Sequence, residues 1–183
     1  MTKVIVPLAQ GCEELEAITI IDLLRRADID VITAGLDDQV VTASRGTRLV
    51  PDTDLDSALK QQYDMVVLPG GMPGADNLDN DPRIKSLLKS MASKDQYTTA
   101  ICAAPKALAN AGILDGKTAT AYPGILDKMN LATTTLIDKP VVIDGKVITS
   151  RGPGTAMDFA LTLIEILAGK DRRVQVETAL VRS

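Results

Sequence analysis

The chain of 183 residues has no histidine, and its two cysteines, Cys12 and Cys102, do not form a CxxC pair. The absence of histidine excludes a Cys-His or Ser-His catalytic pair within this chain. Too few soft ligands remain for zinc, so we expect no metal site. Any chemistry must therefore use cysteine, carboxylates, tyrosine, lysine, arginine and backbone amides.

Long hydrophobic runs and basic clusters are also missing. The longest apolar segments are far too short to cross a bilayer, and the chain begins directly with an apolar strand pattern at residues 3–6. The net charge is −4 with both signs spread along the chain, so we expect no stable nucleic-acid partner. We expect residues 1–183 to form one soluble, cytoplasmic domain that folds without disulfides or metal.

Apolar, β-branched segments alternate with segments of helical periodicity. The sequence predicts strands at residues 3–8, 30–35, 65–68, 98–101 and 117–121, hairpins at 40–50 and 141–149, and helices at 13–27, 55–60, 82–93, 103–111, 155–168 and 171–180. Short links between strands and helices indicate parallel crossovers. We therefore expect an α/β fold with an open, mostly parallel sheet and helices on both faces.

Cys102 stands between a strand suited to burial on both faces and a predicted helix. Pro105 suits the first turn of that helix and Gly112 its end. Unpaired N–H groups and the helix dipole at this position favour the thiolate, which is the nucleophilic form of cysteine. The alternative is that Cys102 is a small core residue, as buried free cysteines often are.

Two further features follow the carboxyl ends of predicted strands. Glu16 lies in the apolar arc of a helix, where a carboxylate is costly unless it is hydrogen-bonded or protonated. Gly70 and Gly71 follow a buried strand and either form a tight turn or turn backbone N–H groups towards a ligand. The GxGxxG and Gly-Lys-Ser/Thr patterns are absent from this loop, and we expect no cofactor. Ligands of such sheets bind at the carboxyl ends of the strands, so these features and Cys102 indicate one site.

Four motifs in this order resemble the ThiJ/PfpI superfamily, and within it the branch of DJ-one and bacterial YajL-type proteins: residues 13–17 (EELEA), 68–71 (LPGG), 100–105 (AICAAP) and 149–155 (TSRGPGT). The resemblance covers residues 3 to about 181. It implies a flavodoxin-like three-layer sandwich that forms a homodimer. It also implies an oxidation-prone Cys102 with protonated Glu16 as its hydrogen-bond partner, and a pocket for an oxyanion or sulfinate oxygen at Gly70, Gly71 and Ala103.

The resemblance bears on several other polar residues. Family members place a pair matching Ser44 and Arg45 near the dimer interface and the site, and we group Arg26 and Tyr122 with Arg45 as candidate site or interface residues. Many members carry histidine at the position of Tyr122. Tyrosine is a poor base near neutral pH, with an ordinary pKa of about 10, which argues against protease-like and amidotransferase-like relatives that need a Cys-His pair. Lys106 and Arg151 are expected to be surface or interface charges.

Two active functions follow from the resemblance. The first is a glutathione-independent glyoxalase or deglycase that acts on small 2-oxoaldehydes or their adducts, with Cys102 as nucleophile and Glu16 as proton carrier. The alternative is an oxidative-stress redox sensor or chaperone in which Cys102 is oxidised to sulfinic acid. Cys12 is then a resolving thiol or, as we expect, an incidental loop cysteine. A third hypothesis is an inactive protein with a structural cysteine beside a hydrogen-bonded carboxyl group.

Overall fold

The structure is a computed structural model that describes residues 2–182. Its strands are β1 (Lys3–Leu8), β2 (Asp30–Gly35), β3 (Val41–Thr42), β4 (Arg48–Leu49), β5 (Thr53–Asp54), β6 (Met65–Leu68), β7 (Tyr97–Ile101), β8 (Thr118–Ala119), β9 (Thr135–Leu136), β10 (Val141–Asp144) and β11 (Val147–Ser150). Its helices are α1 (Glu14–Arg26), α2 (Leu55–Ala58), α3 (Gly74–Asn80), α4 (Pro82–Ser93), α5 (Pro105–Asn110), α6 (Ala156–Ala168) and α7 (Lys170–Ala179), with short 3-10 helices η1 (Leu126–Lys128) and η2 (Pro153–Thr155).

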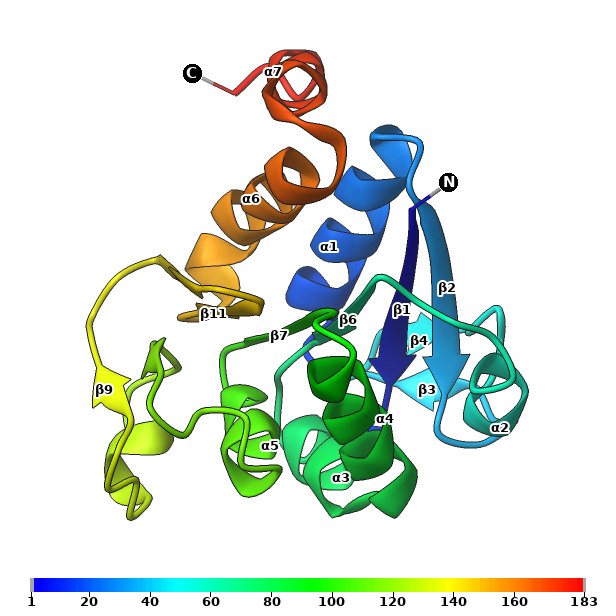
Figure 1. The fold of residues 1–183 in the computed structure, drawn as a ribbon. Coiled ribbons are helices and arrows are strands. Elements are labelled where there is room, and N and C mark those ends of the chain that lie inside the picture. Colours follow the sequence, from blue (N-terminus) through cyan, green and yellow to red (C-terminus); the bar gives the residue numbers. More distant parts are fainter. Residues whose placement is uncertain (1, 183) are drawn as a thin grey trace.

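The main sheet has seven strands in the order β10-β11-β7-β6-β1-β2-β5. Neighbouring strands are parallel except β10 and β11, which form an antiparallel hairpin. Helices α1 and α6 pack together on one face, and α3, α4 and α5 cover the other (Figure 1). The predicted α/β fold with a mostly parallel sheet and helices on both faces is confirmed.

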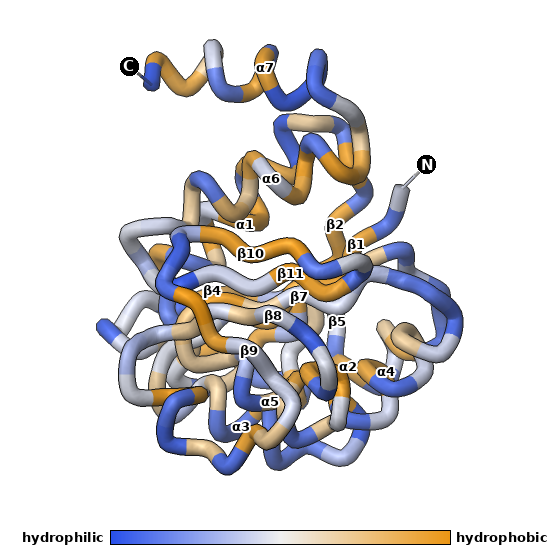
Figure 2. Tube along the Cα trace, turned by 60° about the vertical axis from the view of Figure 1, so that its left-hand side comes forward, coloured by the Kyte–Doolittle hydropathy of each residue, from blue (hydrophilic) through white to orange (hydrophobic). Residues whose placement is uncertain are grey.

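The core lies between the sheet and its two helical layers. Consecutive residues of β1 and β6 are buried, as expected for central parallel strands that are covered on both faces. Phe159 of α6 and Ile20 of α1 are fully buried in the helical layer on one side of the sheet. Strands β10 and β11 begin with hydrophobic residues (Figure 2). Helix α7, which lies farthest from the sheet, alternates between hydrophobic and hydrophilic residues (Figure 2).

Some elements differ from those the sequence predicts. Helix α3 was not expected, because aspartate and asparagine are weak helix formers, and it is stabilised by packing that buries Ala75 and Leu78. The helix predicted from residue 103 begins only at Pro105, and residues 102–104 form a turn. Strand β8 is shorter than expected and pairs with β9 in a separate sheet of two strands. Within residues 2–182, every helix is too short or too polar to cross a membrane.

Candidate active site

Cys102 occupies the turn that follows β7 at the carboxyl edge of the sheet. Its φ of +64° is a left-handed conformation that strains a residue with a side chain, at a cost of roughly 1–2 kcal/mol. The backbone N–H of Cys102 donates to the carbonyl of Ser150 over 2.9 Å, and its carbonyl accepts from the N–H of Tyr122 over 2.8 Å. Hydrogen bonds to two other chain segments therefore hold the strained turn. The arrangement is that of a nucleophile elbow, with the residue 7% exposed.

The loop after β6 passes so close to Cys102 that only glycine fits there. A Cβ atom on Gly70 would lie 2.6 Å from the Cβ of Cys102 and 2.9 Å from Oε2 of Glu16. Gly71 has a φ of +89°, and a Cβ there would lie 2.4 Å from the backbone nitrogen of Glu13. The paired glycines thus allow the β6 loop, the Cys102 turn and the start of α1 to meet at one point.

Glu16 is fully buried in the first turn of α1. Its Oε2 accepts a hydrogen bond of 2.8 Å from the N–H of Gly70, and its side chain also lies against the thiol of Cys102. Within the described chain, the buried Oε1 has no hydrogen-bond partner. Burial raises the pKa of Glu16 to about 7, although the hydrogen bond from Gly70 and the adjacent Cys102 thiol lower it. Glu16 can therefore hold or release a proton near neutral pH.

The expectation that unpaired N–H groups and the helix dipole favour the Cys102 thiolate is confirmed only for the N–H groups, whose effect is outweighed. Burial and the neighbouring Glu16 carboxylate raise the pKa of the Cys102 thiol to about 12, against the opposing effect of the N–H groups of Gly71 and Ala103. Helix α5 has only six residues and begins beyond the turn, so its dipole contributes little. Protonation of Glu16 removes the charge that opposes thiol ionisation. The two groups therefore titrate as a coupled pair.

The backbone N–H groups of the predicted pocket residues Gly70, Gly71 and Ala103 point to different partners. The N–H of Gly70 is used by Glu16, which leaves the N–H groups of Gly71 and Ala103 to face the Cys102 sulfur. Tyr122 is half-exposed, and its backbone flanks the nucleophile. Its side chain lies over Gly152, where an added Cβ would come within 3.2 Å of the ring.

A cavity of about 300 Å³ is lined by Tyr122, Leu126, Ile137 and Arg151, among others. Arg151 forms an ion pair with Asp138 at this cavity. This agrees with the expectation that Arg151 is a surface charge. Within residues 2–182, no three histidine, cysteine, aspartate or glutamate residues are grouped to hold a metal ion.

The two arginines grouped with Tyr122 lie in different places. Arg45 is exposed in the turn between β3 and β4, which is bound to the first turn of α1. Arg26 lies at the other end of α1 and pairs with Asp22 over 2.7 Å. It is ten positions further along the helix than Glu16, which is about 15 Å. Arg26 is therefore outside the site of its own chain, and an interface role for it stays a prediction.

Glu14 is a residue beside the site that the sequence did not single out. Its carboxylate accepts hydrogen bonds from Arg45 N–H at 2.9 Å and from Ser44 Oγ at 3.0 Å. Burial raises its pKa, but hydrogen bonds from backbone and side-chain donors outweigh burial and lower it to about 2. Glu14 thus ties the β3–β4 turn to α1. The signal for it was weak, because a first-turn glutamate is also explained by the helix dipole alone.

Lys106 and Cys12 are also more constrained than expected. Lys106 pairs with Asp76 and lies 3.9 Å from Asp79, so it joins α5 to α3 and is not simply a solvated surface charge. Cys12 is fully buried, and its backbone lies 2.5 Å from where a Cβ of Gly74 would be. Burial raises the pKa of the Cys12 thiol to about 12. Cys12 is therefore a packed, protonated core residue.

A strained cysteine on a strand-to-turn junction, facing a buried glutamate and a Gly-Gly loop, defines a class of cysteine-centred α/β proteins. The family model described as "DJ-1/PfpI family" matches residues 2–166. The chain belongs to this family.

Individual relatives agree with this assignment. The chain is 43% identical over 182 residues to "Parkinson disease protein 7 homolog" of Danio rerio, covering 98% of this chain and 96% of that protein. It is 42% identical to "Protein DJ-1 homolog B" of Arabidopsis thaliana, covering 98% of this chain but only 41% of that longer protein. It is 37% identical over 163 residues to "Glutathione-independent glyoxalase DJR-1.2" of Caenorhabditis elegans, covering 89% of this chain and 87% of that protein.

The solved structures show the same fold. The crystal structure of Drosophila melanogaster DJ-1beta superposes with a TM-score of 0.95 at 41% identity, covering 100% of this chain and 98% of that one. The expected membership of the superfamily is therefore confirmed in both sequence and structure.

Replacing Glu16 with glutamine should remove a pH-dependent part of the stability. Because the pKa of Glu16 rises from 4.5 to about 7 on folding, the folded chain binds more protons than the unfolded chain between these values. The free energy of unfolding therefore falls as pH rises through this range, by roughly 3 kcal/mol. We expect the free energy of unfolding of the wild type to fall by about this much relative to that of Glu16→Gln as pH rises through this range. Urea denaturation at stepwise pH measures it. Parallel stability curves for the two proteins would contradict the raised pKa.

Proposed function

We propose that the protein is a cysteine-dependent enzyme that converts small 2-oxoaldehydes, or their early adducts on amines and thiols, to 2-hydroxy acids. The observation that carries this proposal is the contact of Cys102 with the buried carboxyl group of Glu16, whose pKa lies near neutrality. A nucleophile and a proton carrier in contact are what isomerisation of a 2-oxoaldehyde requires. A relative named as a glutathione-independent glyoxalase supports the same reaction class.

The reaction begins with proton transfer from the Cys102 thiol to the Glu16 carboxylate. The thiolate then attacks the aldehyde carbon and forms an S–C bond, and the carbonyl oxygen becomes an oxyanion. The N–H groups of Gly71 and Ala103, which face the sulfur, are the donors for this oxyanion. The oxyanion takes the proton back from Glu16, and the product is a hemithioacetal.

The second half of the reaction moves a proton between carbons. The Glu16 carboxylate takes the proton from the former aldehyde carbon and returns it to the neighbouring carbon, and the hydroxyl proton passes from the oxygen of the first carbon to the oxygen of the second. These transfers leave a thioester of the 2-hydroxy acid. Water hydrolyses the thioester, releasing the acid and restoring the thiol. The sum is addition of one water to the 2-oxoaldehyde, so no external oxidant or reductant is needed. For an adduct, the amine or thiol is the leaving group.

Lactate release from methylglyoxal tests this assignment. We expect Cys102→Ser to abolish turnover, because serine is a far weaker nucleophile without a strong base. We expect Glu16→Gln to lower kcat by at least about a hundredfold, because general acid–base catalysis contributes on that scale. Cys12→Ala, which alters a buried thiol outside the site, is the matched control and should retain turnover. Full activity of Glu16→Gln would exclude Glu16 as the proton carrier.

A second candidate function, redox sensing or chaperone activity controlled by oxidation, is favoured by the different burial of the two thiols. Cys102 is 7% exposed and borders two amide donors that suit sulfinate oxygens, whereas Cys12 is 0% exposed. Graded peroxide followed by peptide mass mapping separates specific from general oxidation. We expect Cys102 to gain two oxygen atoms before Met72, which is 52% exposed, gains one. Oxidation of Met72 with Cys102 unmodified would count against a sensor.

We also propose that the protein acts as a homodimer through α1. Leu15 and Ile18 lie three residues apart on this helix, and they are 52% and 46% exposed. These two aliphatic side chains, one helical turn apart, offer apolar surface to a second copy of the chain.

Sedimentation velocity tests the homodimer. We expect Ile18→Lys to shift the protein from dimer to monomer, because a lysine charge would be buried at the interface. Ile143→Lys is the matched control, since Ile143 is similarly exposed, at 55%, on the edge strand β10. Dissociation by both variants, or by neither, would contradict an interface on α1.

A further inference from the structure

A cavity of about 620 Å³ lies at the end of β7 opposite to Cys102. It is bordered by the first residues of β7 and β11 and by the residues at or just after the ends of α4 and α5. The length of β7 separates it from the Cys102 edge, roughly 15 Å. It is therefore distinct from the candidate active site.

The cavity concentrates positive charge in a chain whose net charge is −4. Lys89, Lys117 and Lys146 line it together with one acidic residue, Asp95. Lys117 Nζ lies 3.4 Å from Asp144, and Lys146 Nζ lies 4.0 Å above the centre of the Tyr97 ring. Within residues 2–182, neither Lys89 nor Lys146 has a carboxylate within ion-pair distance. Two ammonium groups are thus available to a ligand.

The cations of this cavity are compatible with a phosphate. Lysine binds phosphate as a compact point charge, without the bidentate fork that arginine offers to carboxylates and phosphates alike. The cavity contains three lysines and no arginine. Its remaining walls include Tyr97, Ile113 and Val147, which offer apolar surface to the body of a ligand. A volume of about 620 Å³ lies within the range of small-molecule sites.

We infer that this cavity binds an organic phosphate of about mononucleotide size, with the phosphate held by the lysines and the apolar or aromatic body against Tyr97, Ile113 and Val147. The residues that end α4 and α5 border the same cavity, and helix C-termini carry partial negative charge. Backbone dipoles therefore do not attract the anion. Binding must depend on the lysine side chains, which makes their replacement decisive.

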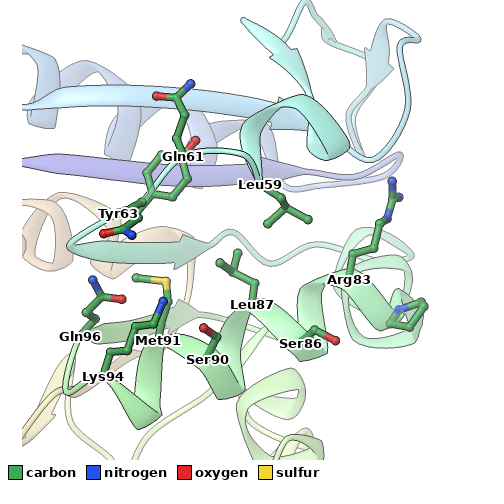
Figure 3. A pocket seen from close by; sticks show the side chains of 12 residues that line it. Leu59, Gln61, Tyr63, Arg83, Ser86, Leu87, Ser90, Met91, Lys94 and Gln96 are labelled. Atoms are coloured by element: carbon green, nitrogen blue, oxygen red, sulfur yellow. The ribbon is translucent and has the colours of Figure 1, made fainter.

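A second cavity, of about 450 Å³, provides a comparison within the same molecule. Figure 3 shows Leu59 and Leu87 facing one another across it, with Arg83 at one end. The Arg83 guanidinium is already bound to Asp81, Asp56 and the carbonyl of Leu36. Among the described residues, this leaves Lys94 as the one lining cation without a carboxylate partner. The second cavity therefore has less charge to offer an anion.

Isothermal titration calorimetry with AMP, adenosine and inorganic phosphate at low salt tests the inference. We expect AMP to bind and adenosine not to bind, because the phosphate supplies the charge contact. We expect inorganic phosphate to bind at least tenfold more weakly than AMP, because it lacks the apolar body. Absence of AMP binding, or equal affinity for AMP and inorganic phosphate, would overturn the assignment.

Variants and shift mapping locate the site. The double variant Lys89→Gln with Lys146→Gln should weaken AMP binding at least tenfold. Lys170→Gln, an exposed lysine on α7 and the matched charge control, should leave it unchanged. Cys102→Ser should also bind AMP normally, so the outcome is independent of the proposed catalysis. In NMR titrations, shifts should centre on Tyr97, Gly112 and Gly145, and shifts centred on the Cys102 turn would place the ligand elsewhere and overturn the inference.

Discussion

The hydrogen bond from the Gly70 N–H to the buried Glu16 carboxyl group is the interaction on which the rest of the site depends. It joins the loop after β6 to the first turn of α1, and both then meet Cys102 in the turn after β7. Since a side chain at Gly70 would collide with Cys102 and Glu16, the contact exists only because this position is glycine. The strained φ of Cys102 is tolerated because Ser150 and Tyr122 hold its backbone from two sides.

Two carboxylates in the same helical turn show how position sets chemistry. Glu14 is surrounded by hydrogen-bond donors of the β3–β4 turn and stays ionised, so it acts as a structural anchor. Glu16, two residues further, points into the core and meets one amide and one thiol, so its pKa moves the opposite way. Neighbouring residues of one helix face different surroundings. Hydrogen-bond donors lower the pKa of a carboxyl group and burial raises it, so the larger of the two effects decides which group carries a proton near neutral pH.

The alternation of buried strands and amphipathic helices predicted the layers of the fold, because that pattern is local and strong. The elements it missed depend on distant partners. Helix α3 has a sequence unsuited to helix and forms where Ala75 and Leu78 become buried, and the short β8 is defined by pairing with β9. Helix α5 begins at Pro105, later than predicted, because the turn at Cys102 is hydrogen-bonded to Ser150 and Tyr122. The sequence alone does not reveal these bonds.

The sequence by itself determined the fold class, the family and the juxtaposition of Cys102, Glu16 and Gly70-Gly71, because residues at the carboxyl ends of parallel strands gather at one edge. Only the tertiary structure decided the protonation of the site. The helix dipole suggested a thiolate, but burial and the contact with Glu16 raise the pKa of the thiol. The distance of Arg26 from the site and the anchoring by Glu14 were likewise decided in three dimensions. A pKa depends on neighbours that are remote in the chain, and so does a contact between two segments. The periodicity that predicts a strand or a helix depends only on residues close together in the sequence.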